Sequence, residues 1–358
     1  MAHLRELIAR MSQTPSAILV VGPSWVGDMV MAQPLFSELR RQYPDCAIDV
    51  LAPAWCRPLL SRMPEVREAL ALPFDHGDLK LGERRALGKS LRGQYQQSYV
   101  LPNSLKSALV PWAAKIPVRT GWRGEMRYGL LNDVRALDKE RYPLMVQRFV
   151  ALALPQDAPM PLLDEITAPH LEVDDASREK AMAAHGLSMA RPVLGLCPGA
   201  EFGPAKRWPE QHYAAVAQHW IDHGGQVWIF GSGKDQPVAS DIVSALSEDA
   251  RAHASVLAGK TSLEEAVDLL SATNAVVSND SGLMHIAAAL TRPLVAVYGS
   301  TSPGFTPPLG DRVAVVRLGL ECSPCFEREC PLGHLNCLKQ LPPSQVIDAL
   351  QQLETADA

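Results

Sequence analysis

Short apolar runs alternate with helical stretches in both halves of this 358-residue chain, which limits the folds that it can adopt. In the first half, apolar runs at 17–22, 48–52 and 98–101 are interleaved with helical patterns at 34–42 and 106–114. Neighbouring parallel strands require such crossover helices. The alternation therefore predicts an α/β fold built on parallel sheets.

The second half repeats this order. Strands are predicted at 193–197, 226–230, 275–277 and 294–298, with helices at 210–223, 235–247, 262–271 and 282–290. Between the halves, residues 155–175 are acidic and contain four prolines, as interdomain connections do. We predict two Rossmann-like, doubly wound domains that face a cleft, with ligands at the carboxyl ends of the strands.

Four segments follow from these patterns. They are an N-terminal extension (1–16), a first domain (17–165), a second domain (166–342), and a C-terminal helix and tail (343–358). Residues 1–16 lack the continuous apolar core of a signal peptide, and no run approaches the about 18 apolar residues that span a bilayer. We therefore expect a cytoplasmic protein without a transmembrane segment.

Charge narrows the class of partner. The formal net charge is -5, which argues against a nucleic-acid protein with a basic surface. Residues 101–150 nevertheless hold nine Lys or Arg against four acidic residues. This local excess predicts an acidic partner for the first domain.

Residues 278–285 (Ser-Asn-Asp-Ser-Gly-Leu-Met-His) join a predicted strand to a predicted helix. Asp280 or Ser281 can cap the helix, Gly282 allows close approach of a ligand, and the free amides at Ser281, Gly282 and Leu283 can bind an anion such as a diphosphate. The alternative is a well-capped helix with no ligand.

The turn after the first strand presents a carboxylate. Residues 22–28 have the glycine spacing of a phosphate loop, but Asp28 stands where such a loop needs Lys. The dinucleotide fingerprint is absent too, which counts against a nicotinamide enzyme. Asp28 is either a general base or a cap of the following helix.

Two further loops follow strands in the second half. Lys206 lies in a Gly- and Pro-rich loop, where it is either a phosphate-binding charge or half of a solvated Lys-Arg pair. Gly231 and Asp235 lie in a third turn, suited to a ribose or base. Together with residues 278–285, these two loops predict a nucleotide site at one edge of the second sheet.

Four cysteines lie close together near the C-terminus: Cys322, Cys325, Cys330 and Cys337, with His334 among them. This spacing can hold a structural, tetrahedral zinc, but four thiolates would leave no open position for catalysis. Reduced thiols packed in a loop, or redox-labile pairs, are the alternatives.

The sequence from Ile18 to about Pro308 resembles glycosyltransferase family 9, the heptosyltransferases. Five stretches carry the resemblance besides the segment from Asn279 to His285: residues 21–29, 52–60, 101–104, 120–125 and 197–208. The first 16 residues have no counterpart in it, and the four-cysteine segment is not shared by every member.

This resemblance implies a GT-B fold and metal-independent, inverting transfer of L-glycero-D-manno-heptose. The donor would be ADP-heptose and the acceptor the first heptose of the lipopolysaccharide inner core (heptosyl-Kdo2-lipid A), at the cytoplasmic face of the inner membrane. Asp28 matches the family's proposed base, Lys206 the lysine that meets the donor diphosphate, and Asp280 with His285 the donor-binding motif. No cofactor is implied beyond the donor itself.

The acceptor carries carboxylates and phosphates, so cations of the first domain are candidates to bind it. These are Arg57, Lys106, Arg119, Arg123 and Arg127, of which Arg123 is the strongest. Two other functions stay open: transfer of the first or third heptose by another enzyme of the family, and a non-catalytic, two-domain protein that closes on a nucleotide.

Overall fold

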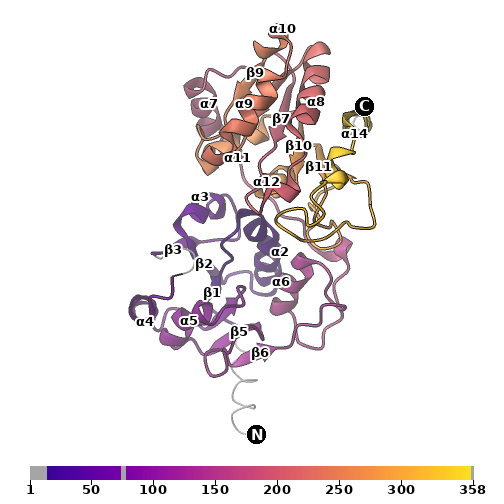
Figure 1. Ribbon diagram of the computed structural model, residues 1–358. Coiled ribbons are helices and arrows are strands. Elements are labelled where there is room, and N and C mark those ends of the chain that lie inside the picture. Colours follow the sequence, from indigo (N-terminus) through magenta and orange to yellow (C-terminus); the bar gives the residue numbers. More distant parts are fainter. Residues whose placement is uncertain (1–13, 74–77, 356–358) are drawn as a thin grey trace. The chain divides into compact units, whose positions relative to one another are not determined.

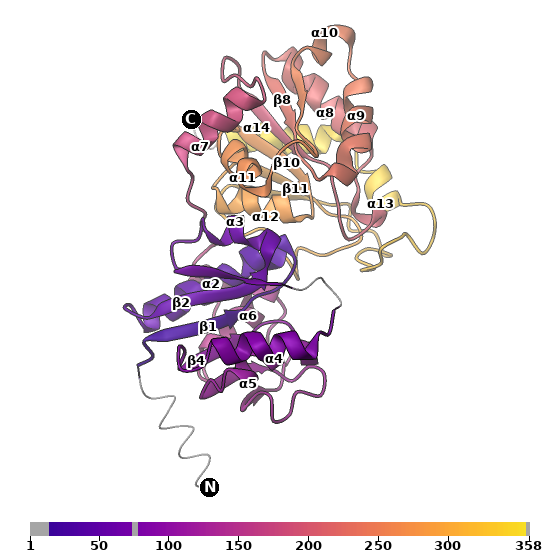
Figure 2. The same cartoon turned by 90° about the vertical axis from the view of Figure 1, so that its left-hand side faces the viewer.

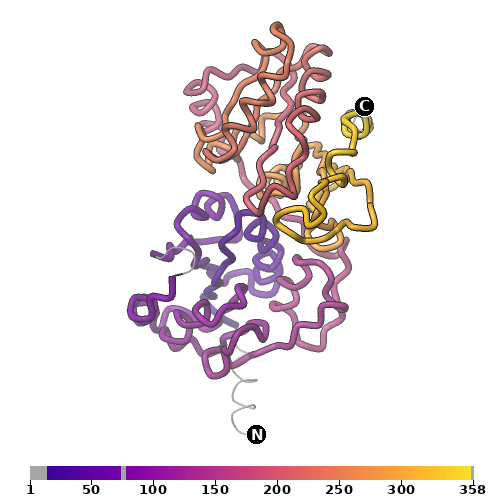
Figure 3. Tube along the Cα trace, viewed as in Figure 1, coloured from indigo at the N-terminus to yellow at the C-terminus, as the bar shows by residue number. Residues whose placement is uncertain are grey.

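The computed structural model describes residues 14–73 and 78–355. The chain divides into two compact units, with the boundary between Thr167 and Ala168. Each unit is built around its own six-stranded sheet (Figure 1), and Figure 3 traces the path of the chain through each unit. Most of the predicted N-terminal extension, residues 1–13, lies outside the described residues.

All strands of the first sheet are parallel, in the order β3-β2-β1-β4-β5-β6. Their bounds are β1 Ala17–Val21, β2 Ala47–Pro53, β3 Glu68–Leu72, β4 Gln97–Val100, β5 Val118–Trp122 and β6 Asp133–Arg135. Every residue of β1 is buried, because helices cover both faces of a parallel sheet.

The helices of the first unit are α2 (Val26–Gln42), α3 (Arg57–Leu60), α4 (Leu81–Ser90), α5 (Leu109–Ala113) and α6 (Met145–Ala153), with 3₁₀ turns η1 (Ala54–Cys56), η2 (Leu105–Ala108) and η3 (Leu163–Glu165). Helix α2 packs against α6, and α4 against α5 (Figures 1 and 2). The predicted start of α2 at residue 34 is wrong, since Pro34 lies inside the helix.

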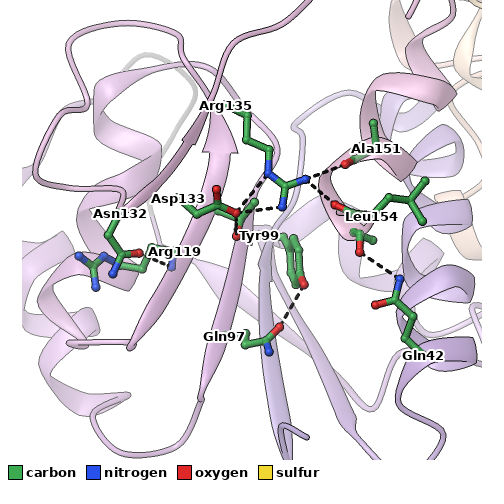
Figure 4. Close-up of polar contacts among 11 residues, drawn as sticks. Gln42, Gln97, Tyr99, Arg119, Asn132, Asp133, Arg135, Ala151 and Leu154 are labelled. Carbon is green, nitrogen blue, oxygen red and sulfur yellow. Dashed lines mark hydrogen bonds and ion pairs between the residues drawn. The ribbon is translucent and has the colours of Figure 1, made fainter. Parts of the chain in front are cut away.

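The buried side chain of Arg135 joins the edge strand β6 to α6 (Figure 4). Arg135 contacts the Asp133 carboxylate at 2.9 Å and donates to the carbonyls of Ala151 (2.8 Å) and Leu154 (2.7 Å). Gln42 of α2 donates to the Ala153 carbonyl at 3.0 Å. These donors satisfy carbonyls at the end of α6 that have no partner within the helix.

The second sheet is also parallel throughout, in the order β12-β11-β10-β7-β8-β9. Its strands are β7 (Val193–Cys197), β8 (Gln226–Ile229), β9 (Ala254–Val256), β10 (Ala275–Asn279), β11 (Leu294–Val297) and β12 (Val313–Val316). In both units the first and fourth strands in sequence lie side by side. Connections run in opposite directions from this point, and ligands bind there in open α/β sheets.

The second unit's helices are α7 (Asp175–Ala184), α8 (Glu210–Asp222), α9 (Gln236–Ser244), α10 (Glu248–Arg251), α11 (Leu263–Ser271), α12 (Gly282–Ala289), α13 (Asn336–Lys339) and α14 (Pro343–Thr355), with 3₁₀ turns η4 (Pro204–Lys206) and η5 (Gly233–Asp235). Helix α8 packs against α9 and α14, whereas α11 packs against α7 and α12 (Figure 2). The core includes Trp208, Tyr213 and Leu338, all fully buried.

The structure confirms the predicted α/β class and two doubly wound sheets. Five strands were not predicted: β3, β5, β6, β9 and β12. Among the described residues, no helix combines the length and apolar character needed to cross a membrane.

Candidate functional site

An ion pair joins the loop after β7 to the end of β10, where the second unit's ligand is expected. Lys206 Nζ lies 2.7 Å from Asp280 Oδ2, with the two side chains 15% and 5% exposed. Thr301, after β11, donates its hydroxyl to the same oxygen at 2.5 Å. One shielded carboxylate thus fixes the position of the predicted phosphate-binding lysine.

The N-terminus of α12 lies next to this ion pair. Ser281 is the N-cap, and its hydroxyl accepts from the Met284 amide at 3.4 Å. The amides of Gly282 and Leu283 belong to the first turn, where helical amides lack intrahelical acceptors. The structure therefore brings the predicted anion-binding amides and Lys206 to one edge of the sheet.

His285 is buried one turn into α12, with its side chain shielded from water. Burial lowers the pKa of His285 to about 4, Lys206 adds to the lowering, and Asp280 opposes it. The ring is neutral at pH 7, so it contributes a hydrogen-bonding group and no charge.

Asn279 organises these loops, a role that the sequence did not reveal. Its amide nitrogen donates to Pro198 O at 2.6 Å, and its Oδ1 accepts from the Trp208 amide (3.1 Å) and the Tyr213 hydroxyl (3.0 Å). Asn279 is completely buried. A polar amide between an apolar strand and a helix was the available signal, because burial of such a group requires partners.

Asp235 is engaged within its own turn. Its Oδ2 accepts from the Ser232 amide (2.9 Å) and hydroxyl (2.8 Å), and Arg207 lies 4.0 Å from Oδ1. A Cβ on Gly199 would lie 2.6 Å from the carboxyl carbon. Asp235 therefore shapes the turn, and its contact with a ribose or base stays a prediction, as does that of Gly231.

Asp28 lies in the first turn of α2, directly after the loop that follows β1. Its side chain is half-buried. The N-cap is Trp25, which makes no side-chain capping bond. The nearby loop after β2 is tied in by Trp55, whose indole donates to Ser24 O at 3.2 Å. Asp28 is thus at the carboxyl edge of the first sheet, at the point between β1 and β4 where that sheet is expected to bind its ligand.

The five candidate acceptor cations occupy two kinds of position. Exposed Arg57 begins α3, half-buried Lys106 lies in η2, and exposed Arg123 follows β5. These three follow strands at the carboxyl edge of the first sheet. In the described part of the chain, the Arg123 guanidinium has no hydrogen bond or ion pair.

Arg119 and Arg127 instead bind backbone carbonyls. Arg119 lies near the start of β5, at the opposite edge of the sheet, and its Nε donates to Leu130 O at 2.6 Å. Arg127 is 2% exposed and donates to the Pro102 and Trp122 carbonyls. Burial lowers the pKa of both guanidinium groups. These hydrogen bonds to backbone carbonyls suit stabilisation of loops. We therefore keep Arg57, Lys106 and Arg123 as the predicted acceptor-binding cations.

The four clustered cysteines line one small cavity of about 20 Å³, together with His334. Cys337 is buried and Cys322 is exposed. Nevertheless, no group of three or more Cys, His, Asp or Glu side chains within residues 14–73 and 78–355 is arranged to hold a metal ion. The structural zinc stays a prediction.

Known proteins are similar to this chain over most of its length. Residues 84–336 match glycosyltransferase family 9 (heptosyltransferase). Lipopolysaccharide heptosyltransferase 2 of Escherichia coli K12 is 54% identical over 344 residues, covering 94% of this chain and 98% of that protein. Lipooligosaccharide heptosyltransferase 2 of Haemophilus influenzae is 55% identical over 307 residues, covering 84% and 88%.

A solved structure agrees. ADP-heptose lipopolysaccharide heptosyltransferase II of Escherichia coli superposes with a TM-score of 0.85 at 51% identity, covering 96% of this chain and all of that one. The predicted two-domain GT-B architecture is thereby confirmed. Given the family match and the identity over nearly its whole length, the chain belongs to glycosyltransferase family 9, the heptosyltransferases.

Proposed function

We propose that this glycosyltransferase moves L-glycero-D-manno-heptose from ADP-heptose to the first heptose of the lipopolysaccharide inner core, heptosyl-Kdo2-lipid A. The observation that carries the proposal is the identity above 50% with enzymes named heptosyltransferase 2, over 94% of the chain for the Escherichia coli protein. The site geometry supports a nucleotide diphosphate as leaving group.

We propose a single in-line displacement that inverts the anomeric carbon. The acceptor hydroxyl must lose a proton while the bond to the diphosphate breaks, so the reaction needs a base on one side and positive potential on the other. Asp28 is the proposed base. Lys206 and the amides of Ser281, Gly282 and Leu283 are proposed to bind the departing diphosphate.

The proposed reaction uses no metal or cofactor, and the helix terminus and Lys206 contribute to the positive potential at the diphosphate. A structural zinc on the four cysteines would leave no open position for catalysis. Elemental analysis of protein purified without chelators tests it, and one equivalent of zinc would support the prediction.

The acceptor is part of a lipid, so the enzyme must meet a membrane surface. We propose that it works at the cytoplasmic face of the inner membrane as a peripheral protein. Arg57, Lys106 and Arg123 are proposed to bind the phosphates and carboxylates of the inner core.

The test is incubation with ADP-heptose and a series of truncated lipopolysaccharides, followed by mass measurement. An acceptor that ends in one heptose should gain one more. Gain on an acceptor without heptose would indicate a first-heptose transferase, and gain only on one with two heptoses a third-heptose transferase. Binding of ADP-heptose without release of ADP would support the non-catalytic alternative.

A further inference from the structure

The positive charge described so far at the donor site is largely compensated. Lys206 Nζ is paired with Asp280 at 2.7 Å, so the two charges nearly cancel at a distance. The N-terminus of α12 contributes roughly half an elementary charge. A departing diphosphate carries more negative charge than this, so a further cation would be expected beside it.

Arg328 is a cation of this kind. Its Cζ lies 5.4 Å from the centroid of the Phe202 ring, and Lys206 Nζ lies 5.1 Å from the same centroid. Both cations therefore lie beside one aromatic ring, that of Phe202, in the loop that holds Lys206. The Arg328 guanidinium is exposed and forms no hydrogen bond or ion pair within the part of the chain that the structure describes.

The backbone, rather than the side chain, fixes the position of Arg328. Its carbonyl accepts from the Ala205 amide at 3.0 Å, directly beside Lys206. A Cβ on Gly203 would lie 2.4 Å from that carbonyl oxygen, so only glycine permits this close approach.

Arg328 belongs to the cysteine-rich segment between β12 and α13, residues 317–335, which is drawn in yellow in Figures 1 and 2. Two further hydrogen bonds hold this segment. The Phe326 amide donates to Ser300 O at 2.7 Å, and the Ser323 hydroxyl donates to Gly299 O at 2.5 Å. Thr301, which donates to Asp280, is the next residue along. The cysteine-rich segment therefore contacts both loops that position the Lys206–Asp280 pair.

We propose that Arg328 is a second cation of the donor site and contacts the diphosphate of the nucleotide sugar, with Phe202 positioning both cations. Cations are attracted to the face of an aromatic ring, so Phe202 can hold both side chains beside the donor loop without a bound anion. When the diphosphate is bound, it relieves their mutual repulsion. The proposal rests on the proposed function.

The test compares binding of ADP, AMP and adenosine to the full-length protein by calorimetry. We expect Arg328→Ala to weaken ADP binding about tenfold at low salt, as for loss of one charge-assisted contact. AMP should lose less, and adenosine nothing. Arg328→Lys should keep part of the affinity, since it retains the charge without the planar donor pair. The difference between wild type and Arg328→Ala should shrink as salt rises.

The matched control is Arg191→Ala, which removes an exposed arginine just before β7, at the opposite edge of the same sheet. It should bind ADP as the wild type does. Unchanged ADP affinity in Arg328→Ala, or an equal loss for all three ligands, would overturn the proposal. Failure of the wild type to bind ADP would instead refute the proposed function.

Discussion

Asp28 is the residue on which the proposed chemistry depends. Replacing its carboxylate by an amide of the same shape, in Asp28→Asn, removes the base and leaves the packing intact. We expect turnover to fall about 10²- to 10⁴-fold, the usual contribution of general base catalysis. ADP affinity should change less than twofold, because the nucleotide is proposed to bind the second unit.

The matched control is Asp45→Asn, an exposed carboxylate in the turn before β2. It should leave turnover unchanged. Steady-state rates and ADP calorimetry on both variants decide the matter, and near-normal turnover in Asp28→Asn would remove it from the mechanism.

His285 makes stability depend on pH. Its folded pKa is about 4 against an ordinary value of 6.5, because burial disfavours the charged ring. Between these values the unfolded chain binds more protons than the folded one. Stability should therefore fall as pH drops from about 6.5 to about 4, by about 3 kcal/mol at most.

Urea unfolding at about pH 7.5 and pH 5 measures this effect. His285→Gln should lose less stability on acidification than the wild type does. The exposed His223 provides the control, since His223→Gln should lose as much stability between the two pH values as the wild type does. Equal pH dependence in all three proteins would contradict the assignment.

The residue types of the donor site could be predicted from sequence, but their partnerships could not. Lys206 and Asp280 lie 74 positions apart, and only the adjacency of β7 and β10 brings them together. Burial was equally hidden. The side chain of Arg127 is buried and donates to backbone carbonyls, whereas that of Arg123 is exposed. The local sequence does not predict this difference, because it arises from the path of the loop around the two residues.

At the scale of elements, the loop after β7 and the start of α12 act as one unit through the Lys206–Asp280 pair. Lys206→Met would remove the ion-pair partner of a carboxylate that is 5% exposed and would leave it the hydrogen bond from Thr301. We expect a loss of about 2 to 3 kcal/mol in unfolding free energy, as for a broken buried pair. ADP affinity should fall about tenfold or more.

A double variant separates the two effects. Lys206→Met with Asp280→Asn removes both charges, so much of the stability should return while ADP binding stays weak. Chemical denaturation and calorimetry on the wild type, both single variants and the double variant give the comparison. Recovery of ADP affinity in the double variant would show that Lys206 acts only through folding.

The elements that sequence predicted are the ones whose patterns are apolar and continuous. Central strands such as β1 and β7 are buried along their whole length, so they stand out. Edge strands β3 and β12 are partly exposed and only five and four residues long, and β6 has only three residues. Their strand form depends on pairing with a neighbour, which a local pattern does not contain.

At the scale of the whole molecule, the sheets of the two units have the same strand order. Alternation of strands and helices predicted two doubly wound sheets, and the right-handed crossover rule explains why each could close only in a few ways. The order itself was not predicted. It places the loops after the first and fourth strands of each sheet together, so that each unit gathers its own set of polar residues.

The assignment of the donor site to the second unit predicts which segments ADP binding protects from hydrogen exchange. ADP at about 100 times its dissociation constant should stabilise the folded state by about 2.7 kcal/mol. In hydrogen exchange followed by mass spectrometry, the largest slowing should fall in peptides covering residues 198–208 and 279–285. Peptides covering residues 22–28 should change little with ADP alone, and Lys206→Met should reduce the slowing at both second-unit segments together. Protection concentrated in the first unit would contradict the assignment of the donor site.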